Sequence, residues 1–397
     1  MLDVTVAREI VLRLAKSLTA ETSALLPDVL GRVLAVDVVS DLDSPPFDKA
    51  LMDGYAVRAE DLANGPVELH VIEEVQAGAM PSKAVGAGEA TAVYTGAPLP
   101  FGIDAVVMKE RCEVLPDGRV RANDPQLRPG KSVLLRGAEM RAGEVVLPAG
   151  TVITPVALGL LAAVGQTTAS LFPRPMLSVL ATGDELVEAD QRPSGGQIRN
   201  SNGPLLMAQA ARAGCQSHYL GIGRDDEASL TALITEGLTN SNILVLAGGV
   251  SAGKFDLVPA VLRKLGVEVH FHHVRMKPGK PLLFGTKGDV LVFGLPGNPV
   301  SAFVGFELFV RPAIQKLAGH QHPGPNVERL PLSQPLATSG DRPTYHPARI
   351  EIGNVVRPLP WLGSADLRAL LLADALIVIP AGNFSVPAGT IVEVIRV

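Results

Sequence analysis

Three polar loops in the central part of the chain carry the residue types that bind anions and divalent metal ions. They are Thr182-Gly183-Asp184-Glu185, the stretch GGVSAGKFD at 248–256, and LPGNP at 295–299, which Ser301 follows. Glycine lets backbone N–H groups approach an oxygen-rich ligand, and carboxylate oxygens suit Mg²⁺. Together the loops predict a site for an anionic ligand beside a magnesium ion. The predicted contacts from the glycine loop are Gly248, Gly249, Ser251 and Gly253.

The glycine loop has the spacing of a nucleotide-binding P-loop, G-x-x-x-x-G-K-[ST], up to its last position. Gly248, Gly253 and Lys254 match the pattern, but Phe255 stands where a hydroxyl would hold magnesium. These residues alone leave two readings open. The loop is either an altered P-loop or a different phosphate site with a similar spacing.

A basic segment, RMKPGKP at 275–281, supplies the positive charge that an anionic ligand needs. Its two prolines restrict the backbone and exclude a regular helix. Lys277 and Lys280 are therefore held in a constrained loop. Each ammonium group can offer phosphate or molybdate a charge-assisted hydrogen bond of roughly 1.5–3 kcal/mol. The alternative is a solvated basic turn without a ligand.

Carboxylates complete the set of candidate residues. Asp184, Glu185 and Asp256 follow predicted strands close to the glycine loop, and we expect Mg²⁺ there. Asp53, in PPFDKALMDGYAV, lies in a loop of turn residues. Taken alone, that position favours an Asx-type hydrogen bond to the backbone.

The elements that position these loops read as an α/β domain, because strand and helix patterns alternate over residues 175–318. Apolar runs such as ILVLA and VLVFG suit strands that are buried on both faces of a parallel or mixed sheet. Ligands of open α/β sheets bind beyond the carboxyl ends of the strands, where the three loops fall. The predicted strands are 176–181, 217–222, 242–247, 267–275, 281–286 and 290–294, and the predicted helices are 203–213, 226–237, 256–265 and 298–317.

The flanking segments have other patterns. Residues 3–18 and 153–165 are predicted helices. Between 33 and 150, short β-like runs are cut by Pro and Gly turns, and helix signals are scarce. After a polar linker at 318–326, the remainder reads as a small, mainly β domain.

Composition limits the classes of protein. The chain has 397 residues, of which 47% are hydrophobic and 19% charged, as in a compact multidomain protein. A net charge of −5 argues against nucleic acid or an anionic membrane as partner, and we find no apolar stretch of membrane-spanning length. Cys112 and Cys215 have no disulfide or metal spacing, so we expect a cytoplasmic protein.

The HFHH stretch at 270–273 is a weak metal signal, and we favour structural or surface roles for it.

The ordered set of motifs resembles one family, the MoeA-type molybdopterin molybdenumtransferases, which include the C-terminal domain of gephyrin. The motifs occur in the family's order and cover residues 5–318 densely, whereas the match past 320 is thin. The matching stretches are PPFDKALMDGYAV, YTGAPLPFGIDAVVMKE, RGAEMRAGEVVLPAG, VLATGDELVE, GQIRNSNGPLL, LAGGVSAGKFD, VRMKPGKPLLFG and GLPGNPVSAFVGFELF.

The resemblance implies an enzyme that takes adenylylated molybdopterin and molybdate, cleaves the phosphoanhydride with the help of Mg²⁺, and releases AMP and molybdenum cofactor. It implies an elongated homodimer, with each site between the α/β domain of one subunit and the second domain of the other. The adenylylated substrate points to an upstream adenylyltransferase as a partner. The implied domains are an elongated N-terminal and linking domain (1–45 and 140–173), a β-rich second domain (46–139), an α/β molybdopterin-binding domain (174–318) and a C-terminal β domain (327–397).

The resemblance also implies site residues, carried over position by position. Glu185 and Asp256 match the pair that the family places at the metal ion. The implied catalytic residues are Asp53, Thr95 and Glu139 from the β-rich part, and Glu185, Asp226, Asp256, Lys277 and Lys280 from the α/β part. The implied ligand-binding residues are Ser251, Pro296, Pro299 and, from the last domain, Ser364, beside the loop residue Asn298.

The resemblance implies that the glycine loop binds molybdopterin. It also implies that Asp256, and not residue 255, binds the metal ion. The chain departs from the usual family pattern at several positions. It has Lys254 where an acidic residue is usual, Asn200 in place of Asp, Glu139 where Asp is frequent, and FDKALMDG instead of FDNSAMDG. At an effective dielectric of 20, the repulsion between an ammonium group and a metal ion about 6 Å away is about 3 kcal/mol per unit of metal charge. We therefore expect Lys254 to point away from the ion.

Two other functions compete with this assignment. The chain could be a non-catalytic molybdopterin-binding or scaffold protein, or a nucleotide pyrophosphatase built on the same α/β domain. The retained acidic pair argues against the first. The motifs around Asp53 and Thr95 argue against the second, because a simple hydrolase has no need of them.

Overall fold

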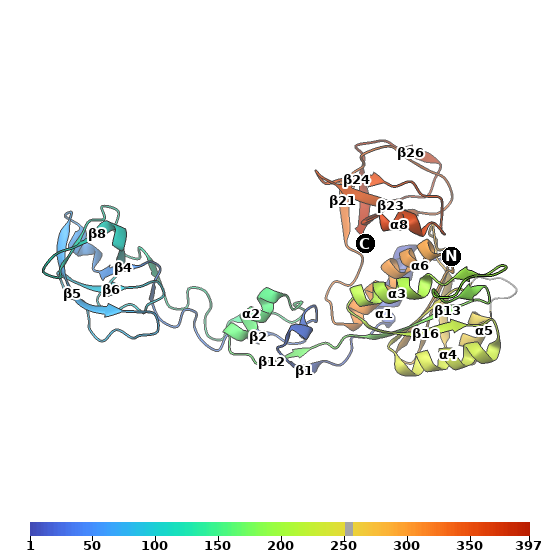
Figure 1. Ribbon diagram of the computed structural model, residues 1–397, viewed down its shortest axis with the longest axis horizontal. Coiled ribbons are helices and arrows are strands. Elements are labelled where there is room, and N and C mark those ends of the chain that lie inside the picture. Colours follow the sequence, from blue (N-terminus) through green and yellow to red (C-terminus); the bar gives the residue numbers. More distant parts are fainter. Residues whose placement is uncertain (251–256) are drawn as a thin grey trace. The chain divides into compact units, whose positions relative to one another are not determined.

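The computed structural model describes residues 1–250 and 257–397 (Figure 1). The chain divides into two compact units. The first contains residues 1–35, 150–154 and 168–397, and the second contains residues 36–149 and 155–167. None of the helices in the described part of the chain has the length and apolar character of a membrane span.

A six-stranded sheet forms the centre of the first unit, in the order β16-β13-β17-β20-β19-β18. The first four strands are parallel, whereas β19 is antiparallel to β20 and β18. The predicted α/β fold with a parallel or mixed sheet is therefore confirmed. The strands are β13 (Met176–Thr182), β16 (Gln216–Gly223), β17 (Ile243–Ala247), β18 (Glu268–His273), β19 (Pro281–Lys287) and β20 (Val290–Leu295).

Helices cover both faces of this sheet, which explains why its central strands are continuous apolar runs. In β17, Ile243 and Val245 join the core on one face, and Leu244 and Leu246 join the core on the other. The first core also takes residues from α1 (Val4–Leu14), α3 (Asn202–Arg212), α6 (Pro299–Gly305) and α7 (Arg311–Leu317), and the second takes residues from α4 (Glu227–Asn240) and α5 (Val258–Lys264).

Two of the predicted helices differ from the observed ones. The helix predicted at 3–18 ends at Leu14, because Ala15 takes an extended conformation. The helix predicted at 298–317 is interrupted between α6 and α7 by a π-helical segment, Phe306–Val310. This segment contains Glu307, whose side chain is 1% exposed. The Glu307 carboxylate accepts hydrogen bonds from Gln209 (2.8 Å), Arg212 (2.6 Å) and Arg311 (3.0 Å).

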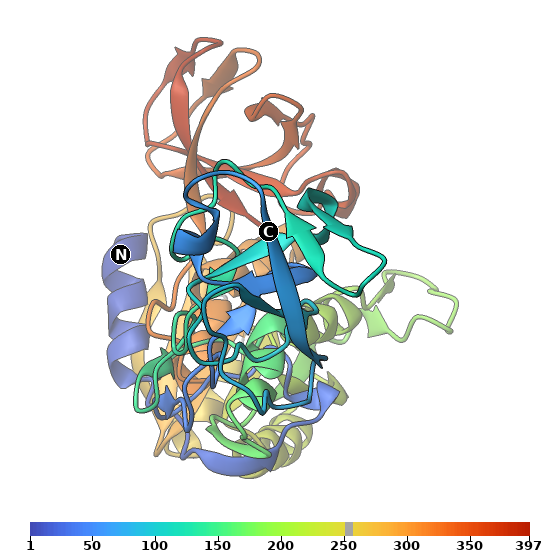
Figure 2. The same ribbon diagram turned by 90° about the vertical axis from the view of Figure 1, so that its left-hand side faces the viewer.

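Two short strands after β13 help to position the first polar loop. β14 (Leu186–Val187) and β15 (Ile198–Arg199) form a parallel pair. The loop between them, 188–197, projects from the unit in Figure 2. The backbone N–H of Ile198 donates to the carbonyl oxygen of Glu185 over 2.8 Å. This ladder therefore fixes the backbone of Glu185.

The C-terminal part of the first unit is a five-stranded antiparallel sheet, in the order β21-β27-β25-β23-β24. A separate pair, β22 and β26, and a short helix, α8, accompany it. The prediction of a mainly β segment after 326 is thus confirmed. The elements are β21 (Val327–Pro331), β22 (Leu336–Thr338), β23 (Thr344–Glu351), β24 (Val355–Pro358), α8 (Leu367–Leu371), β25 (Ala375–Ile379), β26 (Phe384–Val386) and β27 (Ile391–Arg396).

The second unit is built on a six-stranded sheet, in the order β7-β4-β6-β5-β9-β8. Only β5 and β6 of this sheet run parallel. The observed strands agree with the predicted β-rich character of 33–150. They are β4 (Gly54–Val57), β5 (Val67–Val75), β6 (Glu89–Val93), β7 (Ala105–Met108), β8 (Cys112–Val114) and β9 (Val120–Ala122). Outside this sheet, the predicted helix at 153–165 is α2 (Pro155–Ala163).

Candidate functional site

A cavity of about 410 Å³ lies at the carboxyl ends of β13, β17 and β20, where the sequence predicts a ligand site. We call it the strand-end cavity. The three polar loops converge there, as the open-sheet rule requires. Its lining residues are Thr182, Gly183, Glu185, Asp225, Gly248, Gly249, Val250, Pro281, Pro296, Gly297 and Asn298.

The wall after β17 is a glycine turn. Gly248 and Gly249 have φ angles of 101° and 61°, in the left-handed region that favours glycine. The N–H of Gly248 donates to the carbonyl of Leu295 over 3.0 Å, which ties the turn to the end of β20. Among the hydrogen bonds of the described residues, none uses the N–H of Gly249 or Val250. Within the described part of the chain these two backbone donors of the cavity wall have no acceptor, and such donors suit an anion.

Carboxylates enter this cavity from two strand ends. Glu185 is exposed and lines the wall, and Asp225 lines it after β16. A Cβ on Gly183 would lie 2.4 Å from a Glu185 carboxylate oxygen, so glycine at 183 gives this side chain its room. Asp226, in contrast, is outside the lining residues. Its carboxylate caps α4 by accepting the N–H of Ser229 over 2.8 Å.

A hydrogen-bonded chain lies beside the Glu185 segment. The Asn200 side chain accepts the N–H of Gly203 at the start of α3 and donates to the Tyr219 hydroxyl over 2.6 Å. The hydroxyl in turn donates to Glu188 over 2.9 Å. Burial, followed by the hydrogen bond to Glu188, raises the pKa of Tyr219. Asn200, one of the departures from the family pattern, thus has a defined structural role.

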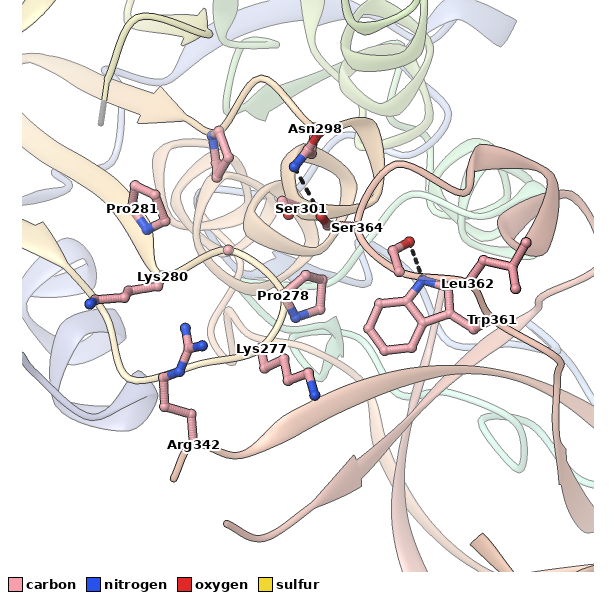
Figure 3. Close-up of a pocket in the computed structure, with 13 residues that line it drawn as sticks. Lys277, Pro278, Lys280, Pro281, Asn298, Ser301, Arg342, Trp361, Leu362 and Ser364 are labelled. Atoms are coloured by element: carbon pink, nitrogen blue, oxygen red, sulfur yellow. Dashed lines mark hydrogen bonds between the residues drawn. The ribbon is translucent and has the colours of Figure 1, made fainter. Parts of the chain in front are cut away.

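A second cavity, of about 480 Å³, contains the predicted lysines (Figure 3). Lys277, Lys280 and Arg342 line it, and we call it the cationic pocket. The Arg342 guanidinium donates to the carbonyl of Met276 over 3.1 Å, so the basic segment itself orients this arginine. In Figure 3 the Lys280 side chain extends away from the polar side chains opposite.

The rest of the cationic pocket contains polar side chains beside the apolar Trp361 and Leu362. Asn298 donates to the Ser364 hydroxyl over 2.9 Å, and Ser301 is only 3% exposed. Asn298, Pro281 and Pro296 line both cavities, so the two are neighbours. The predicted residues Pro296, Asn298 and Ser364 therefore come together. Pro299 begins α6 and lies outside both linings.

The second unit holds the remaining predicted residues. Asp53 accepts hydrogen bonds from the backbone N–H (2.9 Å) and hydroxyl (2.8 Å) of Thr95, and Lys109 donates to its second oxygen over 3.2 Å. These contacts, led by the Thr95 N–H, hold the pKa of Asp53 below its usual value. Asp53 and Thr95 thus contact each other directly, and Asp53 is ionised at neutral pH.

Glu139 lies in a separate set of contacts within the second unit. The Ser44 hydroxyl donates to one of its oxygens over 2.8 Å, and the Lys49 ammonium is 3.8 Å from the other. Lys49 and Glu139 are both departures from the usual family pattern. In this chain the two changed residues form an ion pair with each other.

Several predictions fall on residues that the structure does not describe. Ser251, Gly253, Lys254 and Asp256 lie outside the described residues. Within the described part of the chain, no group of three or more His, Cys, Asp or Glu side chains is arranged to hold a metal ion. His272 contacts the carbonyl of Val250 over 2.6 Å, in line with the structural reading of the HFHH stretch.

Sequence reasoning missed two charged residues of these cavities. Arg342 lies in the C-terminal segment, where the family resemblance is thin, and its only signal is a positive charge in GDRPTYHP. Asp225 is the residue before the predicted Asp226, and which of two adjacent carboxylates turns toward the cavity is set by the cap of α4.

Three family models match consecutive parts of the chain. They are the MoeA N-terminal region (domain I and II) over residues 2–165, a probable molybdopterin binding domain over 178–316, and the MoeA C-terminal region (domain IV) over 329–397. Together the matched segments account for both compact units.

Relatives of nearly the same length are similar to the chain. The molybdopterin molybdenumtransferase of Staphylococcus aureus strain Mu50 is 34% identical over 92% of this chain and 88% of its own length, and that of Bacillus subtilis strain 168 is 34% identical over 94% and 89%. A crystal structure of the MoeA protein of Pyrococcus horikoshii superposes with a TM-score of 0.82 at 32% identity, covering 100% of this chain and 99% of that one. The chain therefore belongs to the MoeA family.

Proposed function

We propose that this chain is a molybdopterin molybdenumtransferase, which inserts molybdenum from molybdate into adenylylated molybdopterin and releases AMP. One observation carries the proposal within this family: two cavities of different chemistry adjoin through Pro281, Pro296 and Asn298. The reaction joins two anions of different shape, so it needs two adjoining anion sites. A simple hydrolase needs only one.

The strand-end cavity would hold the phosphate-bearing part of adenylylated molybdopterin. The N–H groups of Gly249 and Val250, which have no acceptor among the described residues, are suited to phosphate oxygens. Such donors stabilise negative charge as the phosphoanhydride breaks, because they are already oriented before the reaction. Glycines at 248 and 249 let the ligand approach the backbone closely.

We propose Mg²⁺ as the metal ion of this cavity, with Glu185 and Asp256 as its protein ligands. Mg²⁺ in proteins usually takes one or two carboxylates and completes its shell with substrate phosphates and water. The exposed carboxylate of Glu185 in the cavity wall fits this donor set. When bound, the ion would neutralise charge on the phosphoanhydride.

The cationic pocket would bind molybdate, a compact dianion. Two lysines and an arginine line it, together with two serines and an asparagine. Charge-assisted hydrogen bonds of this kind are roughly twice as strong as neutral ones. The boundary residues, among them Asn298, then place molybdate next to the substrate in the strand-end cavity.

We also propose that the chain works as a homodimer. The helix α2 has no charged residue, and its Val156 is 80% exposed. A helix that is apolar on all sides is normally covered, and a second copy of the chain is the partner that a homodimer supplies. A Val156→Asp variant should lower the mass measured by light scattering toward that of a monomer. An unchanged dimer would remove α2 from the interface.

If the two units contribute to one site across the dimer, then Glu185 of one subunit acts with the partner subunit's Asp53. Homodimers of Glu185→Gln and of Asp53→Asn should each be inactive. A mixed dimer of the two variants retains one unaltered site and should regain activity. Continued inactivity of the mixed dimer would contradict this shared arrangement.

The direct test of the function is to incubate purified protein with adenylylated molybdopterin, Mg²⁺ and molybdate. The measurements are AMP release and the ability of the product to activate a molybdenum-free apo-enzyme. We expect the wild type to release AMP and to form product that activates the apo-enzyme. We expect Glu185→Gln and Asp256→Asn to do neither. The exposed Glu236 of α4, changed to Gln, is the matched control and should keep full activity. Binding without turnover would indicate a scaffold or carrier, and AMP release that does not need molybdate would indicate a pyrophosphatase.

A further inference from the structure

The hydroxyl of Thr182 is buried and has no hydrogen-bond partner among the residues that the structure describes. Thr182 is the last residue of β13 and is 2% exposed. Among the described residues, no donor or acceptor contacts its Oγ1 atom. Such orphan hydroxyls are uncommon in native proteins, because water has been removed without a replacement. The position therefore calls for an explanation.

The surroundings of this hydroxyl point to a ligand. Thr182 lines the strand-end cavity together with Glu185 and the glycine turn. A Cβ built on Gly249 would lie 2.8 Å from the Thr182 hydroxyl, and one built on Gly248 would lie 3.1 Å from it. The absence of a side chain at both glycines therefore leaves space beside the hydroxyl. Any larger residue at 248 or 249 would block the hydroxyl.

A second orphan hydroxyl on the same strand provides a comparison. Ser178 is 0% exposed, and its Oγ atom also has no partner among the described residues. Residues 178 and 182 are separated by four positions, so they lie on the same face of β13. Ser178, however, is absent from the lining of the strand-end cavity. The two residues share strand, face and burial, and differ in their access to the cavity.

We propose that the Thr182 hydroxyl is a ligand-binding group, which forms a hydrogen bond with an anionic oxygen of the substrate in the strand-end cavity. This inference rests on the proposed function and adds one residue to its binding site. The hydroxyl acts with the N–H groups of Gly249 and Val250 as a third neutral donor for one phosphate group. A small shift of the glycine turn, which has no side chains to repack, brings the ligand oxygen within reach.

The test uses Thr182→Val, which keeps the shape and removes the hydroxyl, Thr182→Ser, which keeps the hydroxyl, and Ser178→Ala as the matched control. The dissociation constant for adenylylated molybdopterin is measured without molybdate, so that no turnover occurs, and thermal unfolding is followed without ligand. We expect Thr182→Val to bind about 10- to 100-fold more weakly, as for a lost hydrogen bond to a charged group. Thr182→Ser should bind nearly as well as the wild type, and Ser178→Ala should bind equally well.

The unfolding measurement separates a binding role from a structural one. Removing a buried hydroxyl that has no partner should leave the melting temperature of Thr182→Val unchanged or raise it. A variant that fails to fold, or that melts well below the wild type, would overturn the inference. So would wild-type affinity in Thr182→Val, or an equal loss of affinity in Ser178→Ala. A wild-type protein that does not bind adenylylated molybdopterin would overturn the proposed function and this inference with it.

Discussion

Replacing Asn200 with aspartate should destabilise the chain, although it exchanges only an amide for a carboxylate. Asn200 donates to the Tyr219 hydroxyl over 2.6 Å, and the hydroxyl donates to Glu188 over 2.9 Å. The raised pKa of Tyr219 keeps this hydroxyl protonated, so it has one proton to donate. An ionised aspartate has no proton to offer. The hydroxyl oxygen then loses its donor, and two carboxylates compete for a single proton.

The geometry sets the size of this effect. Both carboxylates would contact the same hydroxyl, so they would lie within about 5.5 Å of each other, which is a repulsion of about 1 kcal/mol in water and about 3 kcal/mol at an effective dielectric of 20. Leaving the buried hydroxyl oxygen without a donor costs a similar amount of stability, about 1–3 kcal/mol. We expect Asn200→Asp to lower the free energy of unfolding by about 1–3 kcal/mol at pH 7. The corresponding fall in melting temperature is roughly 2–4 °C per kcal/mol in a domain of this size.

Thermal unfolding of wild type and Asn200→Asp at pH 7 and pH 5 tests this reasoning. The new carboxylate has its folded-state pKa raised above the unfolded value, so the folded state binds more protons and the deficit shrinks as pH falls. In a Tyr219→Phe background, which has no hydroxyl, the effect of the aspartate should be smaller. Equal stability of the two proteins at pH 7, or a deficit that grows at pH 5, would refute the account.

Three further predictions concern other contacts. Arg342→Gln should raise the molybdate concentration needed for half-maximal AMP release about tenfold or more without lowering the melting temperature, because a charge-assisted contact is lost. His272→Leu should raise the KM for adenylylated molybdopterin by releasing the Val250 carbonyl, while His272→Gln, which keeps a donor, should not. Burial alone would raise the pKa of Asp124. The hydrogen bond from Lys131 acts in the opposite direction, and the net result is a pKa below the usual value. The stability from Asp124 is therefore lost only as pH falls through that lowered pKa, and circular dichroism of Lys131→Met should show acid unfolding beginning at a higher pH.

Local sequence patterns were enough to predict the sheet and the loops at its edge. The runs ILVLA and VLVFG are β17 and β20, and the polar residues after them line the strand-end cavity. This works because the carboxyl ends of parallel strands share one edge, so strand assignment alone brings distant loops together. Glu185 and Gly248 were found in this way.

Contacts between segments far apart in the sequence could not be predicted. Arg342 joins the cationic pocket because the N–H of Lys277 donates to the carbonyl of Pro343 over 2.8 Å, a pairing with no local signature. Periodicity likewise predicted the first helix but not that its Val4 and Val11 pack into the core of the α/β sheet. The π-helical segment at Phe306 is stabilised by the tertiary contacts of Glu307, which a helical pattern does not reveal.

The most direct test of the account is whether AMP release depends on molybdate and on the cationic pocket. Purified protein with adenylylated molybdopterin and Mg²⁺ is titrated with molybdate, and AMP is quantified for the wild type and for Lys277→Met. The account predicts that AMP release by the wild type rises to saturation with molybdate, and that the variant needs a much higher concentration. AMP release that is independent of molybdate, or identical in both proteins, would contradict the claim that two adjoining anion sites carry out one reaction.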